Sequence, residues 1–313
     1  MRIRALCFCT ILIGLLYAQA AHAGFAAFPW SAWATGSPPA AAAPGQRDPL
    51  PTLQAHRIAR DQAIQVDGRL DDLPWEKAET AWGFKVWNPD RGREPSEPTL
   101  FKAAYDARAI YFALACHEAD PKRVTKKLSR RDRFSNSDLV SIYIDPYHDE
   151  STAYNFRVNP LGVQEDKYIY NDGEEQDQDW DAVWTAKTYE DGDGWYAEIR
   201  IPFSSIRYRA DASTWGLQVY RYMHGRGEDT AWVIWDRDTP GFVSRFGHLT
   251  GLRDIPAPRQ LELLPYAVYR ATDPSTPGHE RIDNFENLGV DLKYGVTADL
   301  CLNATFQPDF GQV

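Results

Sequence analysis

The stretch SDLVSIYIDPYHDESTAYNFRVNPLGVQEDKYI, residues 137–169, decides the fold of this chain. It predicts two β-strands joined by a polar turn, because apolar residues recur at every second position in two runs. The apolar members of these runs are Val140, Ile142, Ile144, Tyr154, Phe156 and Val158. Successive side chains on a strand point to opposite faces. One face should therefore meet a core, while the other carries Tyr143, Arg157 and Asn159 and is either a ligand site or an ordinary wetted face.

The chain around this stretch shows the same short alternations, with turn signals about every ten residues and little helical period. This pattern predicts an all-β fold, an antiparallel, jelly-roll-like β-sandwich over residues 55–256. A hairpin is expected over residues 101–114, and further strands just before the Asp67-Gly68 turn and over residues 231–237. A short helical piece is expected around Trp75. About 200 residues are ample for one domain with a real core.

The first 54 residues are expected to lie outside this domain. Residues 1–23 are typical of a secretory signal peptide, with Arg2 and Arg4 before an apolar run and Ala21-His22-Ala23 as the cleavage site. That run is too short for a membrane span. Residues 24–54 form an Ala/Pro-rich linker. The mature chain then keeps Cys116 and Cys301 in unrelated segments, so no disulfide framework is expected.

Residues 257–313 change in character. Leu288, Val290, Leu292 and Tyr294 alternate with polar or very small residues, and a similar segment follows a turn at residues 297–299. Alternation over about ten residues per segment is the signature of a membrane β-barrel strand. A few such strands cannot close a barrel, and open edges cannot face lipid. We therefore expect the first strands of a truncated β-barrel in an outer-membrane protein, the sequence being a fragment of a larger chain.

Charge limits the partners of the protein. The formal net charge is -10, which argues against nucleic acid, so the basic run at residues 122–133 is expected to be a solvated face. An acidic loop follows the central stretch and is either solvated or able to hold calcium through hard oxygen ligands, without the spacing of an EF-hand. Its carboxylates are Asp172, Glu174, Glu175, Asp177, Asp179 and Asp181.

Catalytic patterns are sparse. The sequence has no nucleophile elbow, phosphate loop or HExxH zinc motif. A glycosidase needs two carboxylates at a defined separation, and Asp138, Asp145 and Glu198 are the strand carboxylates that could serve. A structural role is expected for each, with Glu198 pairing with a basic neighbour. No catalytic residue is therefore assigned.

Seven of the eleven tryptophans of the chain can be assigned to one of two groups. Trp75, Trp184, Trp195 and Trp215 lie at positions that predict burial in the core. The tryptophans that lie in predicted loops, and are candidates for exposed platforms, are Trp82, Trp87 and Trp180.

Several ordered motifs between residues 58 and 252 resemble carbohydrate-binding module family 9. They are VDGRLDDLPW, YDARAIYFALACHEADP, SDLVSIYIDP, YNFRVNPLGV, DGWYAEIRIPF and RFGHL. That family is a β-sandwich known as an accessory module of xylanases. The tail, with PYAVYR and NLGVDLKYGVTADL, is similar to the start of an uncharacterised barrel-forming domain that often follows this module in Gram-negative bacteria.

The resemblance implies a sugar site on the outward sheet face, built from two tryptophans with charged and amide side chains. The arginine and asparagine of that site fall on Arg157 and Asn159. The two tryptophan positions instead hold residues next to Phe134 and Phe242, a carboxylate becomes Ser141, and an amide becomes Tyr220. Because the tryptophan pair is lost, the resemblance predicts the fold of this chain better than its ligand specificity. The predicted ligand-binding set is Arg157, Asn159, Tyr143, Tyr220, Phe134 and Phe242.

Three functions follow from these features. The first is a glycan-binding module, for a glycan or another polar ligand, in an exported outer-membrane or periplasmic protein of a Gram-negative bacterium linked to polysaccharide catabolism. The second is a glycoside hydrolase acting on O-glycosyl bonds, which the missing acid/base pair disfavours. The third is a plug or structural domain of the barrel that binds no sugar. The resemblance also implies structural calcium, although no metal ligand is assigned.

Overall fold

The computed structural model describes residues 49–133, 136–209, 211–236, 238–255, 261–270, 285–295 and 301–306. The predicted signal peptide, nearly all of the linker, Phe134 and the turn at residues 297–299 lie outside these ranges. The ranges contain one short α-helix, α2 (Leu73–Lys77), around Trp75 as expected. No helix in them is long and apolar enough to cross a membrane.

The central stretch forms three strands. β6 (Leu139–Asp145) pairs antiparallel with β7 (Ala153–Val158), in a register that places Tyr143 opposite Asn155. The expected pair of strands is therefore present, but the prediction of only two strands is wrong. Residues Gln164–Tyr170 form β8, antiparallel to β7. The polar start of this segment (QEDK) hides it from an apolar-alternation test, because its charged residues lie on the outward face or pair internally.

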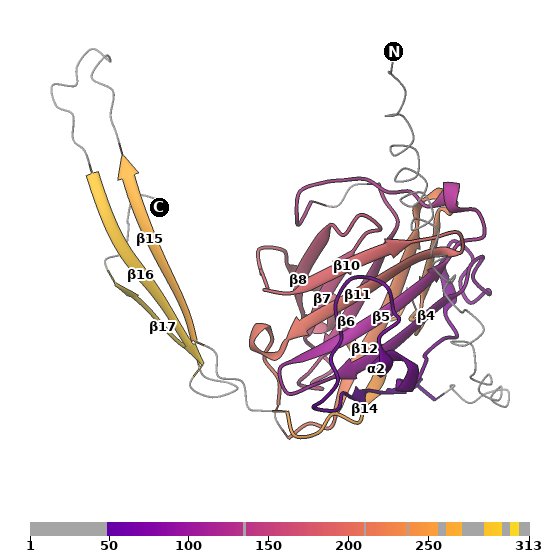
Figure 1. The fold of residues 1–313 in the computed structure, drawn as a ribbon, viewed down its shortest axis with the longest axis horizontal. Helices are drawn as coiled ribbons and strands as arrows, with labels where there is room; N and C mark the ends of the chain where they lie inside the picture. The colour runs from indigo at the N-terminus through magenta and orange to yellow at the C-terminus, as the bar shows by residue number, and fades with distance from the viewer. Residues whose placement is uncertain are drawn as a thin grey trace, which may run out of the picture.

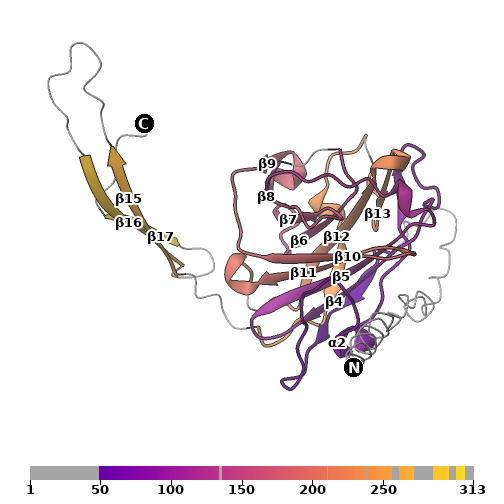
Figure 2. The same ribbon diagram turned by 45° about the horizontal axis from the view of Figure 1, so that its top comes forward.

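Two sheets make up the body of the protein (Figure 1). The first has the order β1-β14-β12-β6-β7-β8-β9, with β13 pairing β12 and β3. Its other strands are β1 (Thr52–Gln54), β3 (Lys85–Asn88), β9 (Glu175–Asp177), β12 (Thr214–Met223), β13 (Glu228–Ala231) and β14 (Gly247–Thr250). The second has the order β10-β11-β5-β4-β2, with β2 (His56–Arg57), β4 (Thr99–Tyr105), β5 (Ala109–His117), β10 (Thr185–Glu190) and β11 (Gly194–Pro202). Figure 2 shows the two sheets as stacked layers.

The core lies between these sheets and uses the alternation that the sequence predicts. Ile142 and Phe156 of the first sheet and Phe112 and Ile199 of the second are all 0 % exposed and belong to one cluster. Most pairings are antiparallel; β1–β14 and β2–β4 are parallel. The predicted all-β sandwich is confirmed.

The predicted core tryptophans are also buried. Trp195 and Trp215 are 0 % exposed, and Trp184 belongs to the same cluster. Trp75 is buried in a second cluster, between α2 and the outer face of the second sheet. Cys116 is buried and has a free thiol, whose pKa burial raises to about 12.

Two strand predictions are wrong. Residues 62–68 have no strand, because this segment is held by side chains rather than by a neighbouring strand: the Glu198 carboxylate accepts from the backbone N–H groups of Asp67 and Gly68. The strand expected over residues 231–237 ends at Ala231, where β13 stops. Beyond it, the Gln218 side chain bonds the backbone N–H and C=O of Val233, which replaces a sheet ladder.

Residues after 260 form a third sheet, which stands apart from the sandwich in Figures 1 and 2. It contains β15 (Leu261–Arg270), β16 (Phe285–Gly295) and β17 (Cys301–Phe306), all antiparallel. The register places Val290 between Pro265 and Phe306, so apolar residues of three strands share one face. Leu288 is 70 % exposed and Phe306 72 %. The alternation that buries the sandwich core here leaves an open apolar face.

Candidate functional site

A polar cluster lies on the outward face of the first sheet, across β6, β7 and β8. Arg157 donates one hydrogen bond to the Glu165 carboxylate at 3.1 Å and one to the Tyr143 hydroxyl at 3.3 Å. Lys167 Nζ lies 3.3 Å from the other Glu165 oxygen. The register explains this grouping, since Arg157 is opposite Ser141 on β6 and Glu165 on β8. The Arg157 side chain is 25 % exposed, so it is held in place but still reachable from solvent.

Three buried polar atoms of this cluster make no hydrogen bond within the described part of the chain. They are Ser141 Oγ, Asn155 Oδ1 and Arg157 Nε. Ser141 and Asn155 are both 0 % exposed. A buried polar atom without a partner costs roughly 1–3 kcal/mol unless water or a ligand meets it. The outward face therefore has hydrogen-bonding capacity that the protein itself does not use.

Phe242 covers this face with an aromatic ring. Its ring meets Tyr143 edge-on, with 5.1 Å between centroids, and also contacts Phe246 at 5.0 Å and Trp235 at 4.7 Å. Trp235 in turn stacks on Trp87 at 4.9 Å. Tyr143 is left buried under the cover. The aromatic set thus extends from Tyr143 to Trp87, one of the predicted loop platforms.

Asp172 fixes the loop that carries Phe242. Its Oδ1 accepts from the backbone N–H groups of Phe242 and Ser244, and its Oδ2 from the Ser244 hydroxyl at 2.7 Å. Although burial opposes ionisation, these hydrogen bonds lower the pKa of Asp172. Gly173 allows the close approach, because a Cβ there would lie 2.6 Å from the Phe242 Cβ. The first carboxylate of the predicted acidic loop therefore holds the aromatic cover.

Tyr220 joins the cluster from β12, where it lies opposite Ser141. Burial and the adjacent Asp229 carboxylate raise the pKa of Tyr220, so its hydroxyl stays protonated and donates. The structure thus gathers Arg157, Tyr143, Tyr220 and Phe242 on one face. Phe134, the other predicted aromatic, lies outside the described residues.

Asn159 organises the turn after β7. Its amide nitrogen donates to the Lys127 carbonyl at 2.8 Å, and its oxygen accepts from the backbone N–H groups of Leu161 and Val163. The side chain is 1 % exposed. Ligand contact by Asn159 stays a prediction, and its geometry favours a role in positioning the end of β7.

The carboxylates considered for glycosidase chemistry are bonded to internal donors. Among the described residues no ion pair is formed by Glu198, so the predicted pairing with a basic neighbour is wrong there: besides Asp67 and Gly68 it accepts from Trp75 Nε1 at 2.8 Å. Asp145 accepts from two backbone N–H groups of the following turn, and burial raises its pKa to about 6. These contacts anchor the segment before α2 and the turn after β6.

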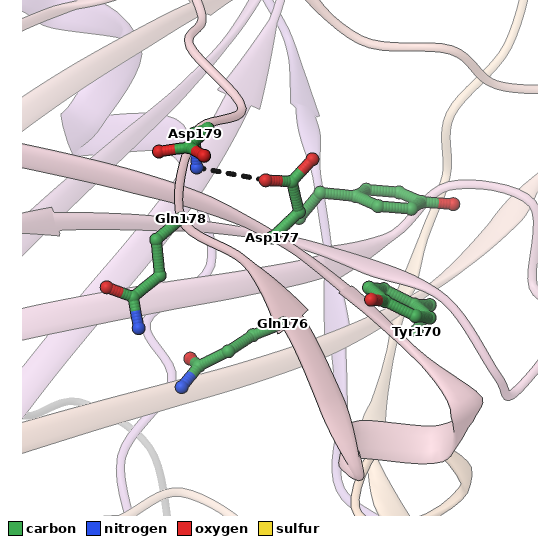
Figure 3. A pocket seen from close by; sticks show the side chains of 6 residues that line it. Tyr170, Gln176, Asp177, Gln178 and Asp179 are labelled. Atoms are coloured by element: carbon green, nitrogen blue, oxygen red, sulfur yellow. Dashed lines mark hydrogen bonds between the residues drawn. The ribbon is translucent and has the colours of Figure 1, made fainter.

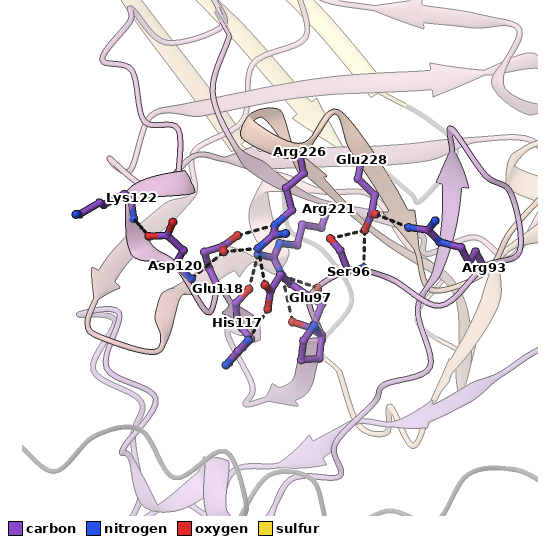
Figure 4. Close-up of polar contacts among 12 residues, drawn as sticks. Arg93, Ser96, Glu97, His117, Glu118, Asp120, Lys122, Arg221, Arg226 and Glu228 are labelled. Atoms are coloured by element: carbon purple, nitrogen blue, oxygen red, sulfur yellow. Dashed lines mark hydrogen bonds and ion pairs between the residues drawn. The ribbon is translucent and has the colours of Figure 1, made fainter.

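Figure 4 shows a charged network at one end of the sandwich. The Arg226 guanidinium bonds both Glu97 and Glu118, and His117 Nδ1 lies 2.7 Å from Glu97. Arg221, fully buried, donates to the carbonyl of His117 at 2.7 Å. Burial opposes ionisation of Glu118, but Arg226 lowers its pKa. A general acid needs a raised pKa, so this network is suited to joining strand ends rather than to glycoside cleavage.

A second surface lies on the opposite side of β8, where it meets β9 (Figure 3). Tyr168 and Tyr170 have nearly parallel rings, with centroids 6.3 Å apart and planes 19° apart. The register places Asp177 opposite Tyr168. The groove has a volume of about 690 Å³. Its lining residues are Tyr168, Tyr170, Gln176, Asp177, Gln178 and Asp179.

The acidic loop has protein partners at several of its carboxylates. Besides Asp172, Asp177 accepts from the backbone N–H of Asp179 at 2.9 Å, and Asp181 pairs with Arg131 at 2.9 Å. Among the residues that the structure describes, no group of three or more His, Cys, Asp or Glu side chains could hold a metal ion. Structural calcium stays a prediction.

Comparisons with known proteins agree with this architecture. Residues 66–250 match the family model described as "Carbohydrate family 9 binding domain-like", and residues 257–313 match "Domain of unknown function (DUF5916)". The comparison with curated proteins found no match. A crystal structure of a candidate carbohydrate-binding protein from Bacteroides uniformis is 17 % identical, with a TM-score of 0.51, covering 64 % of this chain and 99 % of that one.

A carbohydrate-binding module of family 9 from Caldicellulosiruptor kristjanssonii, in complex with glucose, is 16 % identical with a TM-score of 0.47. That match covers 64 % of this chain and 95 % of the module. At sequence identities of 16 % and 17 %, similarity to these solved structures says something about the fold alone and nothing about the ligand. The family model, in contrast, matches more than half of the 313 residues. The chain therefore belongs to the carbohydrate family 9 binding domain-like family, and its residues from 257 onward match the DUF5916 domain.

Proposed function

We propose that the sandwich binds a glycan on its outward face, around Arg157. The observation that carries this proposal is the set of buried polar atoms without partners at Ser141, Asn155 and Arg157. Sugar hydroxyls donate and accept hydrogen bonds, so they can satisfy all three. Family membership supports the same ligand class.

The residues of this face have separate roles in the proposed complex. Arg157 is oriented by Glu165 and Tyr143 and offers its remaining N–H groups to the ligand. Phe242 and Trp235 form an aromatic wall against which the apolar side of a sugar ring can pack. The loop held by Asp172 must yield for a ring to reach the buried atoms, since Tyr143 is only 7 % exposed.

A glycan array with the full chain tests the proposal. Binding to a glycan is expected, and Arg157→Ala should weaken it by at least about tenfold, the usual value of a charge-assisted hydrogen bond. Arg157→Lys should weaken it less, because the positive charge is kept. Equal affinity of wild type and Arg157→Ala for every bound glycan would place the site elsewhere.

A structural or plug domain is the second candidate function, favoured by the burial of Tyr143 beneath Phe242. In that case no glycan on the array is bound. A glycoside hydrolase is disfavoured by the internal hydrogen bonds of Asp145 and Glu198. Release of reducing sugar from xylan, abolished by Glu198→Gln, would support the enzyme instead.

We also infer that the protein is exported through residues 1–23 and that residues 257–313 begin an outer-membrane barrel. The exposed apolar face of β16 and β17, with Leu288 and Phe306, supports this inference. Full-length protein should remain with membranes after a carbonate wash. Val290→Arg should destabilise the membrane-inserted form by about 2–4 kcal/mol near the bilayer midplane. Recovery of the full-length protein in the soluble periplasmic fraction would exclude the barrel.

A further inference from the structure

The groove at β8 and β9 has a rigid aromatic side. The ring centroids of Tyr168 and Tyr154 lie 5.2 Å apart, and those of Tyr154 and Trp180 lie 4.9 Å apart. The groove tyrosines are therefore part of a row of aromatic rings that reaches the core. Tyr168 packs against the main core cluster, which restrains its ring. Trp180, predicted as an exposed platform, instead packs against Tyr154 and the main core cluster. Two residues apart on one strand, Tyr168 and Tyr170 present parallel rings along its direction.

A second tyrosine pair in the protein shows what a filled platform looks like. Tyr189 and Tyr196 lie 6.2 Å apart with planes 24° apart, nearly the geometry of the groove pair. The Arg69 guanidinium lies over the Tyr189 ring, 4.5 Å from its centroid. No such cation–π contact is made at Tyr168 or Tyr170 by the described residues. Both tyrosines line the groove and are half-buried, so part of each ring is accessible to an external partner.

The strand that borders the groove supplies hydrogen-bonding groups. Asp177 of β9 lies opposite Tyr168, so its carboxylate is on the same face of the strand pair as the tyrosine rings, and Asp179 also lines the groove. Gln176 lies opposite Ile169, and in Figure 3 the amides of Gln176 and Gln178 extend away from the Tyr170 ring, at the edge of the groove. Aromatic rings combined with a few polar groups are typical of sites for small polar molecules. Sugar rings have both an apolar face and hydroxyl edges, and fit this combination.

Charge narrows the class of glycan. Asp177 and Asp179 line the groove, and the sequence from 168 to 186 contains no lysine or arginine. A uronate or sulfate group would meet these carboxylates at close range and be repelled. Hydroxyl groups would instead donate to them.

We propose that this groove is a second glycan-binding surface, which takes a neutral, hydroxyl-rich chain over Tyr168 and Tyr170 and rejects anionic chains. It shares no lining residue with the outward face around Arg157. The two surfaces lie on opposite sides of β8, so binding at one can be tested by mutation independently of binding at the other.

The test is calorimetric titration of the full chain with cellohexaose, xylohexaose and mannohexaose, and with hexagalacturonate as the anionic probe. At least one neutral chain should bind, and hexagalacturonate should not bind the groove. Tyr170→Ala should weaken neutral binding about three- to tenfold, the range of aromatic stacking, and Tyr170→Phe should not. Tyr189→Ala, the matched pair in the other sheet, should leave affinity unchanged.

Each result decides the proposal separately from the outward site. Asp177→Asn with Asp179→Asn should gain affinity for hexagalacturonate if the carboxylates set the charge preference. The groove proposal is overturned if wild type binds none of the neutral chains, or if Tyr170→Ala binds them as tightly as wild type. Loss of binding in Arg157→Ala alone would leave the outward face as the only site, whereas loss in Tyr170→Ala alone would leave only the groove.

Discussion

The two faces of β8 differ in how far their side chains are already engaged. On the outward face, Glu165 and Lys167 join Arg157 beneath an aromatic cover. On the opposite face, Tyr168 and Tyr170 line an open groove. A single strand of alternating side chains can therefore build two different surfaces.

This difference predicts different costs of binding. The covered face holds its charged groups in fixed positions, but a ligand must displace part of the loop that carries Phe242. The groove needs only the removal of water from half-buried rings and from the polar groups beside them. We therefore expect mutations of the covered face to affect stability as well as binding, and mutation of Tyr170 in the groove to affect binding alone.

Phe156→Ala should break both surfaces at once. Phe156 precedes Arg157 on β7, is 0 % exposed, and contacts the rings of Trp180 and Trp184. Truncation of a buried phenylalanine costs about 3–5 kcal/mol of unfolding free energy. Urea unfolding followed by tryptophan fluorescence measures this change. Leu288→Ala, at a 70 % exposed position of the third sheet, is the control and should change the free energy of unfolding by less than about 0.5 kcal/mol. If Phe156→Ala lowers the free energy of unfolding by less than about 1 kcal/mol, the central role of this ring is contradicted.

The sequence allows the sandwich and its core to be predicted because apolar alternation is a local signal. Ile142, Phe156 and Ile199 are buried as their spacing predicts. Apolar alternation does not identify β8, because polar residues occupy both of its faces: Asp166 points inward and accepts hydrogen bonds from Trp184 Nε1 and the Ala182 N–H. These donors lie far along the chain, so no local sequence pattern predicts them.

The site was predictable only in part for a related reason. Alternation and family resemblance both indicate Arg157, and the structure places it at the centre of the polar cluster. Glu165, Trp235 and the Asp172 contact to Ser244 were not predicted, because each depends on chain segments brought together by the fold. The signal for the groove was present as two tyrosines spaced by two residues, but a strand had to be assigned there first.

The ion pair on the covered face should contribute more than an exposed pair. A double-mutant cycle with Arg157→Met and Glu165→Gln should give a coupling free energy of about 1–2 kcal/mol, because Glu165 is largely buried. The same cycle on Lys126 and Glu190, a more exposed pair, should give no more than about 0.5 kcal/mol. Thermal or urea unfolding supplies the four free energies of each cycle. Equal coupling free energies would mean that the Arg157–Glu165 pair is as solvated as the Lys126–Glu190 pair.

Asp172→Ala should loosen the aromatic cover by about 1 kcal/mol, since it removes hydrogen bonds to Phe242 and Ser244. Hydrogen exchange of these two amides measures the opening, with Asp211→Ala, a solvent-exposed aspartate bonded to Arg209, as the control. The folded-state pKa of Asp172 is lowered, so its contribution is complete above the unfolded pKa of about 3.9 and is lost as pH falls through the lower folded value. Protection should therefore be constant from neutral pH to about pH 4 and fall below it. Unchanged exchange in Asp172→Ala would show that the aromatic contacts alone hold the loop.

The smallest expected effect is that of calcium removal, which tests the acidic loop between the two surfaces. Asp172, Asp177 and Asp181 already accept hydrogen bonds from Ser244, the Asp179 backbone and Arg131. A calcium ion would have to displace these donors to collect enough oxygen ligands. A chelator should therefore shift the unfolding temperature by less than about 1 °C, whereas an ion bound only to the folded state would raise it in proportion to the logarithm of its concentration. A rise that continues with calcium concentration, and disappears in Asp177→Asn, would show that the ion rather than the protein donors organises the side of β8 that carries the groove.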